Sequence, residues 1–286
     1  MIDYDKLLNW SFPEIEHRLT QRDTMLYALG IGLGADPLDR KQLRFIYEKE
    51  LLAFPSIASI LCYPGNWLRN PRTGVDYLRI MNGGTRFLIH RPLPTEGTFI
   101  STPRVIDIVD KGIGKGAIIV SEREVYNKAS GDLVCTITVT TFARGDGGFG
   151  GPAHQLVTPP RAPDTTPQMS IEISTARNAA LVYRLSGDHN PLHCDPDVAR
   201  AAGFQEPILH GLATLGVATH ALLKGCCDYD TTRLKSVDAR YTAPVIPGDI
   251  VRTDLWREGP IIRFRSVVPS RNAIVLDYGK AEITNS

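Results

Sequence analysis

Alternation of apolar and polar residues dominates the first half of the chain and predicts an antiparallel sheet. The runs richest in β-branched residues are 84–91, 98–110, 115–126 and 133–143, and several of them alternate between apolar and polar positions. Lys128 to Gly131 separates the last two runs and is typical of a hairpin turn. Before the sheet, residues 21–35 carry apolar residues at helical spacing, so we expect a helix there with Asp23 as its candidate N-cap.

The second half repeats this order of helix followed by strands. Residues 170–184 begin as a strand or loop and turn helical, and residues 207–224 predict an apolar helix with small residues on most faces. Strands are expected at 232–243, 249–258, 260–268 and 273–284, with turns at 247–249 and 258–260. A helix rich in Gly and Ala lets strands approach closely and wrap it, which favours an α+β fold of the hot-dog type.

A proline-rich polar segment, PPRAPDTTP at 159–167, predicts a linker between the halves. We therefore divide the chain into an N-terminal half (1–152), a linker (153–169) and a C-terminal half (170–286). The halves share too little sequence identity to be read as a repeat, although their architecture can still be duplicated. The glycine-rich run at 145–152 is not followed by a Lys-Ser/Thr pair or a helix start, so we expect a flexible turn and not a phosphate loop.

Charge and composition exclude several classes of protein. With 32 basic and 31 acidic residues the net charge is +1, which gives no broad electrostatic footprint for nucleic acid. Five cysteines without regular spacing indicate free thiols in a reducing compartment. No signal peptide is visible, and no run approaches the ~20 apolar residues of a membrane helix. The chain ends Thr284-Asn285-Ser286, unlike a Ser-Lys-Leu tail, so we expect a cytoplasmic protein without a membrane span.

The candidate chemistry is concentrated in SGDHNPLHCD, from Ser186 to Asp195. Asp188, Asn190 and His193 lie on a segment that Pro191 keeps out of a regular helix. A carboxylate and an imidazole held on one loop can share a water molecule, one accepting a proton while the other gives one. Asn190 can hold such a water without titrating.

Two other interpretations of this segment stay open at this point. His189 and His193, with Cys194 or Asp195, have a spacing that zinc ligands use on a helix, although Pro191 argues against a shared helical face. The segment could also be a capped polar loop with surface histidines.

Gly211 supplies a third element of the chemistry. It follows Ile208-Leu209-His210 at the start of the predicted apolar helix, where a backbone N–H lies at the positive end of the helix dipole. Because glycine has no side chain, this amide could bind and polarise a thioester carbonyl and stabilise an enolate. Close packing between helix and strand is the alternative reason for a glycine here.

Long motifs of this chain resemble the (R)-specific enoyl-CoA hydratase family, hydratase 2, which is related to the MaoC-type dehydratases. In the second half they are YRLSGDHNPLHCDP (183–196), AGF (202–204) and PILHG (207–211). In the first half they are YALGIG (27–32), FIYE (45–48), RPLP (91–94), DKG (110–112) and GGFGG (147–151). The resemblance implies a double hot-dog fold with one active site in the C-terminal half, the N-terminal half accommodating the acyl chain.

The resemblance also implies roles for individual residues. Asp188 and His193 would be the acid/base pair acting on water, Asn190 their support, Gly211 the oxyanion amide, and Glu48 a glutamate important for activity. Residues expected to contact the CoA substrate are Gly83, Lys111, His189, His210 and Tyr241. The chain departs from the family at Asn82-Gly83-Gly84, where relatives often have His-Gly-Glu, and this puts the CoA contacts and acyl preference at that position in doubt.

These features predict reversible hydration of trans-2-enoyl-CoA to (3R)-3-hydroxyacyl-CoA, with no metal or redox cofactor. The expected partner is an acyl-CoA, and a homodimer is a family expectation. Two alternatives remain: a hot-dog acyl-CoA thioesterase and a non-catalytic acyl-CoA-binding protein.

Overall fold

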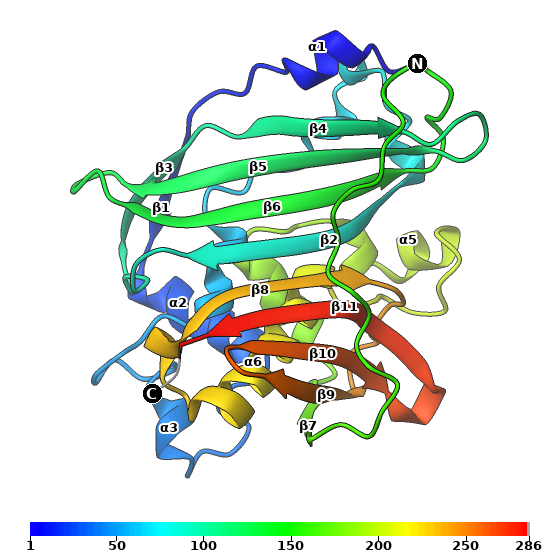
Figure 1. The fold of residues 1–286 in the computed structure, drawn as a ribbon. Helices are drawn as coiled ribbons and strands as arrows, with labels where there is room; N and C mark the ends of the chain where they lie inside the picture. Colours follow the sequence, from blue (N-terminus) through cyan, green and yellow to red (C-terminus); the bar gives the residue numbers. More distant parts are fainter. Residues whose placement is uncertain (285–286) are drawn as a thin grey trace.

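An antiparallel sheet curves around the helices of the molecule (Figure 1), as seen in a computed structural model that describes residues 1–284. The strands are β1 (Ile15–Leu19), β2 (Ile80–Ile89), β3 (Gly97–Ser101), β4 (Arg104–Asp110), β5 (Ala117–Asn127), β6 (Leu133–Ala143), β7 (Met169–Ser174), β8 (Leu234–Tyr241), β9 (Ile250–Glu258), β10 (Ile261–Val268) and β11 (Ala273–Ile283). Their order is β1-β3-β5-β6-β2-β8-β11-β10-β9-β7, and β4 pairs with β5. The two halves of the chain therefore contribute the two ends of one sheet.

The halves are joined where β2 pairs with β8. Five residue pairs form this seam, from Gly84 opposite Arg240 to Leu88 opposite Ser236. Side chains alternate between the two faces of a strand, so Thr85 and Ala239 point to the buried inner face while Arg86 and Arg240 point to the outer face. Every predicted strand is confirmed. The run 98–110 is nevertheless two strands, because Pro103 has no N–H for a ladder and separates β3 from β4.

The α-helices are α1 (Tyr4–Leu8), α2 (Gln21–Gly30), α3 (Arg40–Leu43), α4 (Ala179–Tyr183), α5 (Pro196–Ala201) and α6 (Gly211–Cys227). The long helix α6 lies against the inner face of the sheet, and α1, α3 and α5 lie at the periphery (Figure 1). The short 3₁₀ helices are η1 (Pro55–Ile60), η2 (Trp67–Arg69), η3 (Pro71–Thr73), η4 (Tyr77–Arg79), η5 (Arg184–Ser186), η6 (Pro191–His193), η7 (Thr231–Arg233) and η8 (Pro269–Arg271). Both long helices predicted from the sequence are present, each with bounds that differ by a few residues.

The N-cap of α2 corrects one expectation. Thr20, not Asp23, is the N-cap, since Thr20 has the extended backbone that this position requires. Its hydroxyl accepts the Asp23 N–H, and the Asp23 carboxylate accepts the Thr20 N–H. Asp23 thus completes a capping box from inside the helix.

Helix α6 is the centre of the C-terminal half. Its apolar and small residues are buried almost throughout, and it packs against β7, β8, β9 and β11. Gly216 allows α6 to pack closely on the end of α2 as well, because a Cβ there would lie 2.5 Å from the Ile31 side chain. In the N-terminal half the corresponding place against the sheet is taken by η1, whose six residues are all buried.

Residues 144–168 connect β6 to β7 without a helix or strand and cross the outer face of the sheet (Figure 1). We call this segment the strap. Its glycine-rich start is fixed in place, contrary to the flexible turn that we expected. The Asp110 carboxylate accepts the backbone N–H groups of Gly112, Gly148 and Gly150 at 2.7–2.9 Å. The hydrogen bonds from these amides lower the pKa of Asp110. Because the Asp110 carboxylate already binds these amides, they do not form a phosphate loop.

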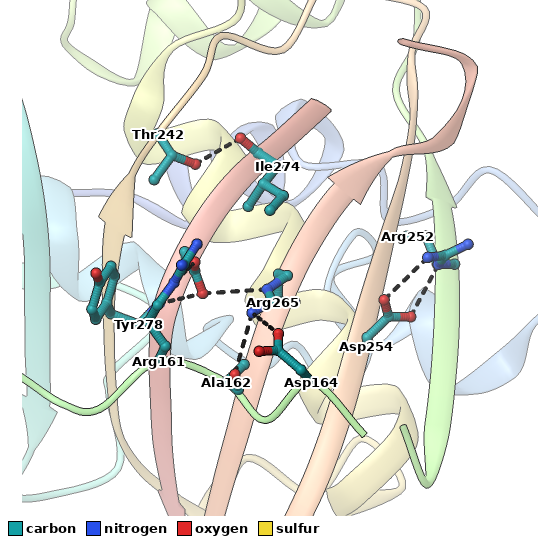
Figure 2. A network of polar contacts seen from close by, with 10 residues as sticks. Arg161, Ala162, Asp164, Thr242, Arg252, Asp254, Arg265, Ile274 and Tyr278 are labelled. Carbon is teal, nitrogen blue, oxygen red and sulfur yellow. Dashed lines mark hydrogen bonds and ion pairs between the residues drawn. The ribbon is translucent and has the colours of Figure 1, made fainter. Parts of the chain in front are cut away.

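The far end of the strap is bound to the C-terminal half (Figure 2). Arg161 donates to the fully buried Asp277 carboxylate at 2.9 Å, and Arg265 donates to Asp277 at 3.4 Å and to the Ala162 carbonyl at 3.2 Å. Burial opposes ionisation of Asp277, but the Tyr278 N–H and the two guanidinium groups outweigh it and lower its pKa. The strap is therefore held at both ends; the domain boundaries at 152/153 and 169/170 remain predictions.

Among residues 1–284, no helix is long and apolar enough to cross a lipid bilayer. The last two residues of the C-terminal Thr284-Asn285-Ser286 lie outside the described part of the chain.

Candidate active site

The loop from Gly187 to Asp195 has the bent geometry that its sequence predicts. Gly187 has φ +112°, a left-handed conformation that favours glycine, and Asn190 is extended before Pro191 begins η6. The Asn190 side-chain carbonyl accepts the Leu192 N–H at 3.1 Å, and the Asn190 N–H donates to Asp188 at 3.2 Å. Because the oxygen of the Asn190 amide is engaged, its NH₂ group is the part left to bind a water or substrate.

The tautomer of His193 follows from its hydrogen bond. Its Nδ1 lies 2.8 Å from the Ile208 carbonyl, which can only accept, so Nδ1 carries the proton. The other ring nitrogen, Nε2, is then the basic one. Burial lowers the pKa of His193, while the bond to Ile208 and the charge of Asp188 act in the opposite direction. His193 is therefore neutral at pH 7 and able to accept a proton.

His210 supports this arrangement from the next element. Its ring stacks on His193, with centroids 3.8 Å apart and planes inclined by 28°. Its Nε2 donates to the Asp188 carbonyl at 3.1 Å, and Nδ1 is buried without a partner among the described residues. Burial, and secondly the neighbouring His193, lower the pKa of His210 to about 4. His210 thus fixes both catalytic candidates while remaining uncharged.

Asp188, His193 and His210 each offer a ligand atom within 4.8 Å of the others, a spacing that a metal ion could use. Their orientation fits this poorly. One nitrogen of each histidine already donates to a carbonyl, and two nearly parallel rings cannot both direct a lone pair at one ion about 2 Å away. The geometry favours proton transfer. His189, central to the metal interpretation of the sequence, is exposed and outside this group.

Gly211 is the first residue of α6, where amides have no acceptor within the helix. No side chain caps them, since His210 at the N-cap gives no capping hydrogen bond. A Cβ on Gly211 would lie 3.2 Å from the Tyr241 ring. The close packing and the uncapped amide, which we treated as alternatives, are therefore both present.

Gly83 and Lys111 meet in a pocket on the outer face of the sheet, with a volume of about 330 Å³. Its floor comes from β2, β5, β6 and β8, and residues 156–159 of the strap form its other side. The basic residues Lys111, Arg86 and Arg240 face one acid, Asp238. Tyr241 follows Arg240 on β8 and points to the opposite face of the sheet. Arg240 therefore lines the outer pocket, whereas Tyr241 lies against Gly211 near the catalytic loop.

The predicted residues thus fall into three groups. Asp188, Asn190, His193, His210, Gly211 and Tyr241 lie together, and Gly83 and Lys111 line the outer pocket. Glu48 is exposed, and no hydrogen bond or ion pair of the described residues joins it to the catalytic loop; His189 lies on that loop, but its side chain is exposed and makes no hydrogen bond or ion pair there. Their roles stay predictions.

Sequence reasoning did not single out two tyrosines of this region. The ring of Tyr183 lies 5.0 Å from that of His210, although Tyr183 opens the motif that was recognised. Burial, with the charge of Asp188, raises the pKa of Tyr63 to about 12. Nothing in the sequence around Tyr63 indicates that it lies near Asp188.

Two family models cover most of the chain. The MFE-2 hydratase 2 N-terminal domain matches residues 17–145, and the MaoC like domain matches residues 159–277, which include the catalytic loop and Gly211. The chain belongs to the MaoC-like hydratase 2 family. The family assignment made from the sequence motifs is thereby confirmed.

Relatives of this family match over nearly the full length. The chain is 36% identical to "Enoyl-CoA hydratase 2, peroxisomal" of Arabidopsis thaliana, covering 95% of this chain and 93% of that protein. It is 37% identical to "Peroxisomal multifunctional enzyme type 2" of Drosophila melanogaster, covering 99% of this chain but 49% of that protein. It therefore spans about half of the multifunctional enzyme and nearly all of the plant hydratase.

Solved structures confirm the fold. A MaoC-like dehydratase from Phytophthora capsici superposes with a TM-score of 0.87 at 33% identity, with both chains fully covered. A protein of Mycobacterium tuberculosis described as having a double hot-dog fold superposes with a TM-score of 0.55 at 14% identity, which supports the fold alone. The expected α+β double hot dog is confirmed.

Proposed function

We propose that this member of the hydratase 2 family catalyses the reversible hydration of trans-2-enoyl-CoA to (3R)-3-hydroxyacyl-CoA. The observation that carries the proposal is that an uncharged His193 with a free basic nitrogen lies within 4.8 Å of the carboxylate of Asp188 and stacks on His210, the residue before the uncapped amide of Gly211. Relatives named enoyl-CoA hydratase 2 support the same activity.

The reaction needs three functions that these groups can supply. The Gly211 N–H binds the thioester oxygen, which makes C3 electrophilic and stabilises the enolate that forms when water adds. Asp188 and His193 exchange protons with the water, which is held by the NH₂ group of Asn190. One group accepts a proton as the C3–O bond forms, and the other delivers a proton to C2. Because one loop supplies both groups, addition is syn.

The CoA portion would lie in the outer pocket. Lys111, Arg86 and Arg240 give it an excess of positive charge that suits the phosphates of CoA, and backbone of Gly83 and Gly84 lets the ligand approach β2 closely. From there the pantetheine arm would pass the end of the β2–β8 seam to reach Gly211.

The direct test is loss of the enoyl-thioester absorbance when purified protein is mixed with trans-2-enoyl-CoAs of several lengths, followed by determination of the product's configuration. Asp188→Asn and His193→Gln should each lower kcat by about 10²–10⁴-fold. Unchanged melting temperatures would show that these losses are not unfolding. Release of free CoA from saturated acyl-CoA, without hydration, would instead establish the thioesterase alternative; ligand binding without any turnover would establish the binding protein.

Three further expectations belong to this proposal. The proton transfers described here use side chains and water, with the CoA thioester as substrate, so we propose that no metal or redox cofactor takes part. A homodimer and a cytoplasmic location are proposed from the family and from the sequence. Localisation of tagged protein would test the latter against the peroxisome, which appears in the names of several relatives.

A further inference from the structure

Buried polar atoms without a partner are concentrated around the candidate active site. In the described part of the chain six such residues lie just before the catalytic loop or in the elements around Gly211: Thr85, Tyr183, Arg184, Ser186, His210 and Tyr241. Among them, Tyr183 lies near the Tyr27 hydroxyl and Thr85 near the Tyr241 hydroxyl. Folded proteins pair nearly all buried polar groups, because an unpaired one costs free energy. Such a concentration beside reactive groups therefore indicates atoms arranged for a ligand.

Tyr241 is the one of these whose ring packs directly on Gly211. Its ring covers the Cα of Gly211: a Cβ built there would be 3.2 Å from Cε1, 3.4 Å from Cδ1 and 3.5 Å from Cζ. The phenol oxygen is one bond beyond Cζ and is buried. The Thr85 hydroxyl acts on it as a donor, and the phenol proton has no acceptor among the described residues. The ring that carries this buried hydroxyl thus packs on the residue that supplies the uncapped N–H.

We propose that the Tyr241 hydroxyl donates a second hydrogen bond to the thioester oxygen of the substrate, beside the Gly211 amide. The inference rests on the proposed function, which places that oxygen at Gly211. A carbonyl oxygen has two lone pairs and gains negative charge as the enolate forms, so two donors stabilise it better than one. The hydroxyl only shares its proton; water still provides both the hydroxyl at C3 and the hydrogen at C2.

The surroundings of Tyr241 suit a donor. Thr85 lies on the inner face of β2 opposite Ala239, two residues before Tyr241 on β8, and its hydroxyl is also buried. Thr85 acts on the pKa of Tyr241 as a donor to the phenol oxygen does, which leaves the phenol proton for the substrate. Burial raises the pKa of Tyr241, so its hydroxyl stays protonated throughout the range in which His193 is neutral.

The test is Tyr241→Phe, which removes one oxygen and keeps the ring that covers Gly211. We expect kcat for enoyl-CoA hydration to fall by about 10- to 100-fold, less than the loss of an entire oxyanion site because the Gly211 amide remains. The matched control is Tyr229→Phe, which removes another buried phenol oxygen, bonded to His220 at 2.9 Å near the opposite end of α6. This control should leave kcat unchanged.

A spectroscopic measurement separates donation from a merely structural role. The absorption maximum of 3-phenylpropenoyl-CoA shifts to longer wavelength when its carbonyl is polarised. We expect a red shift on binding to the wild-type protein, a smaller shift with Tyr241→Phe, and the full shift with Tyr229→Phe.

The possible outcomes are distinct. Wild-type kcat and a full red shift in Tyr241→Phe, with an unchanged or raised melting temperature, would overturn the proposal and leave an unused buried hydroxyl. If the wild-type protein hydrates no enoyl-CoA, the proposed function fails; a red shift that depends on Tyr241 would then still support the donor. No red shift and no turnover in the wild type would overturn both.

Discussion

The two halves of the sheet enclose different helices, and the difference begins at the first residue of each. In the C-terminal half α6 starts with Gly211, whose backbone N–H is uncapped. In the N-terminal half η1 starts with Pro55, which has no N–H to offer. The halves share a strand architecture, yet only one of these two helix starts can donate to an oxyanion. Under the proposed function, catalytic capacity depends on local backbone chemistry more than on the fold.

The interiors differ as well. The long α6 satisfies most of its carbonyls internally, while the end of η1 relies on Arg123 from β5. Arg123 donates to the carbonyls of Ser59 at 2.5 Å and Leu61 at 2.9 Å, and it is 4% exposed. No carboxylate forms an ion pair with it among the described residues, and burial lowers its pKa to about 10. The buried Arg123 guanidinium thus supplies hydrogen-bond donors to carbonyls at the end of η1, whereas most carbonyls of α6 are bonded within the helix itself.

The largest expected effect within this comparison is a loss of kcat when α6 is given a proline as its first residue, as η1 has. Gly211→Pro removes the oxyanion N–H without breaking the helix, since proline is favoured at the first helical position. His210 already has φ −57° and ψ 139°, which suits a residue before proline. We expect kcat for hydration to fall by about 10²–10³-fold. Gly211→Ala is the matched control, because it adds the same Cβ against Tyr241 but keeps the amide.

If Gly211→Ala and Gly211→Pro lose activity equally, crowding against Tyr241 explains the loss and the amide does not. Melting temperatures of both variants would show whether α6 remains folded.

Removing the cation from the N-terminal half should cost stability. Arg123→Ala leaves two buried carbonyls without donors and a cavity, so we expect a loss of about 3 kcal/mol in the free energy of unfolding. Urea unfolding measures this. Glu124→Ala, on the opposite face of β5, is the control and should change stability by less than about 1 kcal/mol. An Arg123→Ala protein as stable as the wild type would show that η1 needs no cap.

The C-terminal half should also be the more acid-sensitive one, because burial lowers the pKa of His193, His210 and His220 there and of His17 alone in the N-terminal half. His210 is neutral in the folded protein down to about pH 4, whereas an exposed histidine in the unfolded chain is protonated below about 6.5. Between these values the unfolded state binds the extra proton, so stability falls as pH falls, by about 1.4 kcal/mol per pH unit for one such group. Unfolding experiments from pH 7 to 4 should show this slope, and His210→Gln should reduce it. His90→Gln, an exposed control, should leave it unchanged.

The smallest expected effect is a loss of stability when the strap loses its ion pair with the C-terminal half. Arg161 pairs with Asp277, but its side chain is 59% exposed and Arg265 also contacts that carboxylate. Arg161→Gln should therefore lower stability by less than about 1 kcal/mol. A loss of several kcal/mol in thermal or urea unfolding would mean that Arg265 does not compensate.

Periodicity predicted nearly all strands and α6, because each buried strand keeps apolar residues at every second position. It erred where single residues override the pattern: Pro103 divides one run, and the backbone of Thr20 displaces Asp23 from the cap. Motifs identified the loop containing Asp188 and His193. They could not identify the stacking of His210, the hydroxyl of Tyr241 beside Gly211, or the buried Arg123, because these depend on contacts between residues distant in sequence.

The seam between β2 and β8 has a consequence for how the chain is made. Its partners are Gly84 and Arg240 at one end and Leu88 and Ser236 at the other, so more than half of the protein is synthesised between them. Until β8 emerges from the ribosome, β2 is an open strand edge with unpaired N–H and C=O groups, the kind of edge that recruits other chains. Such distant pairing also slows folding. We expect the nascent N-terminal half to be the aggregation-prone stage of biosynthesis, protected only once β8 has paired with β2.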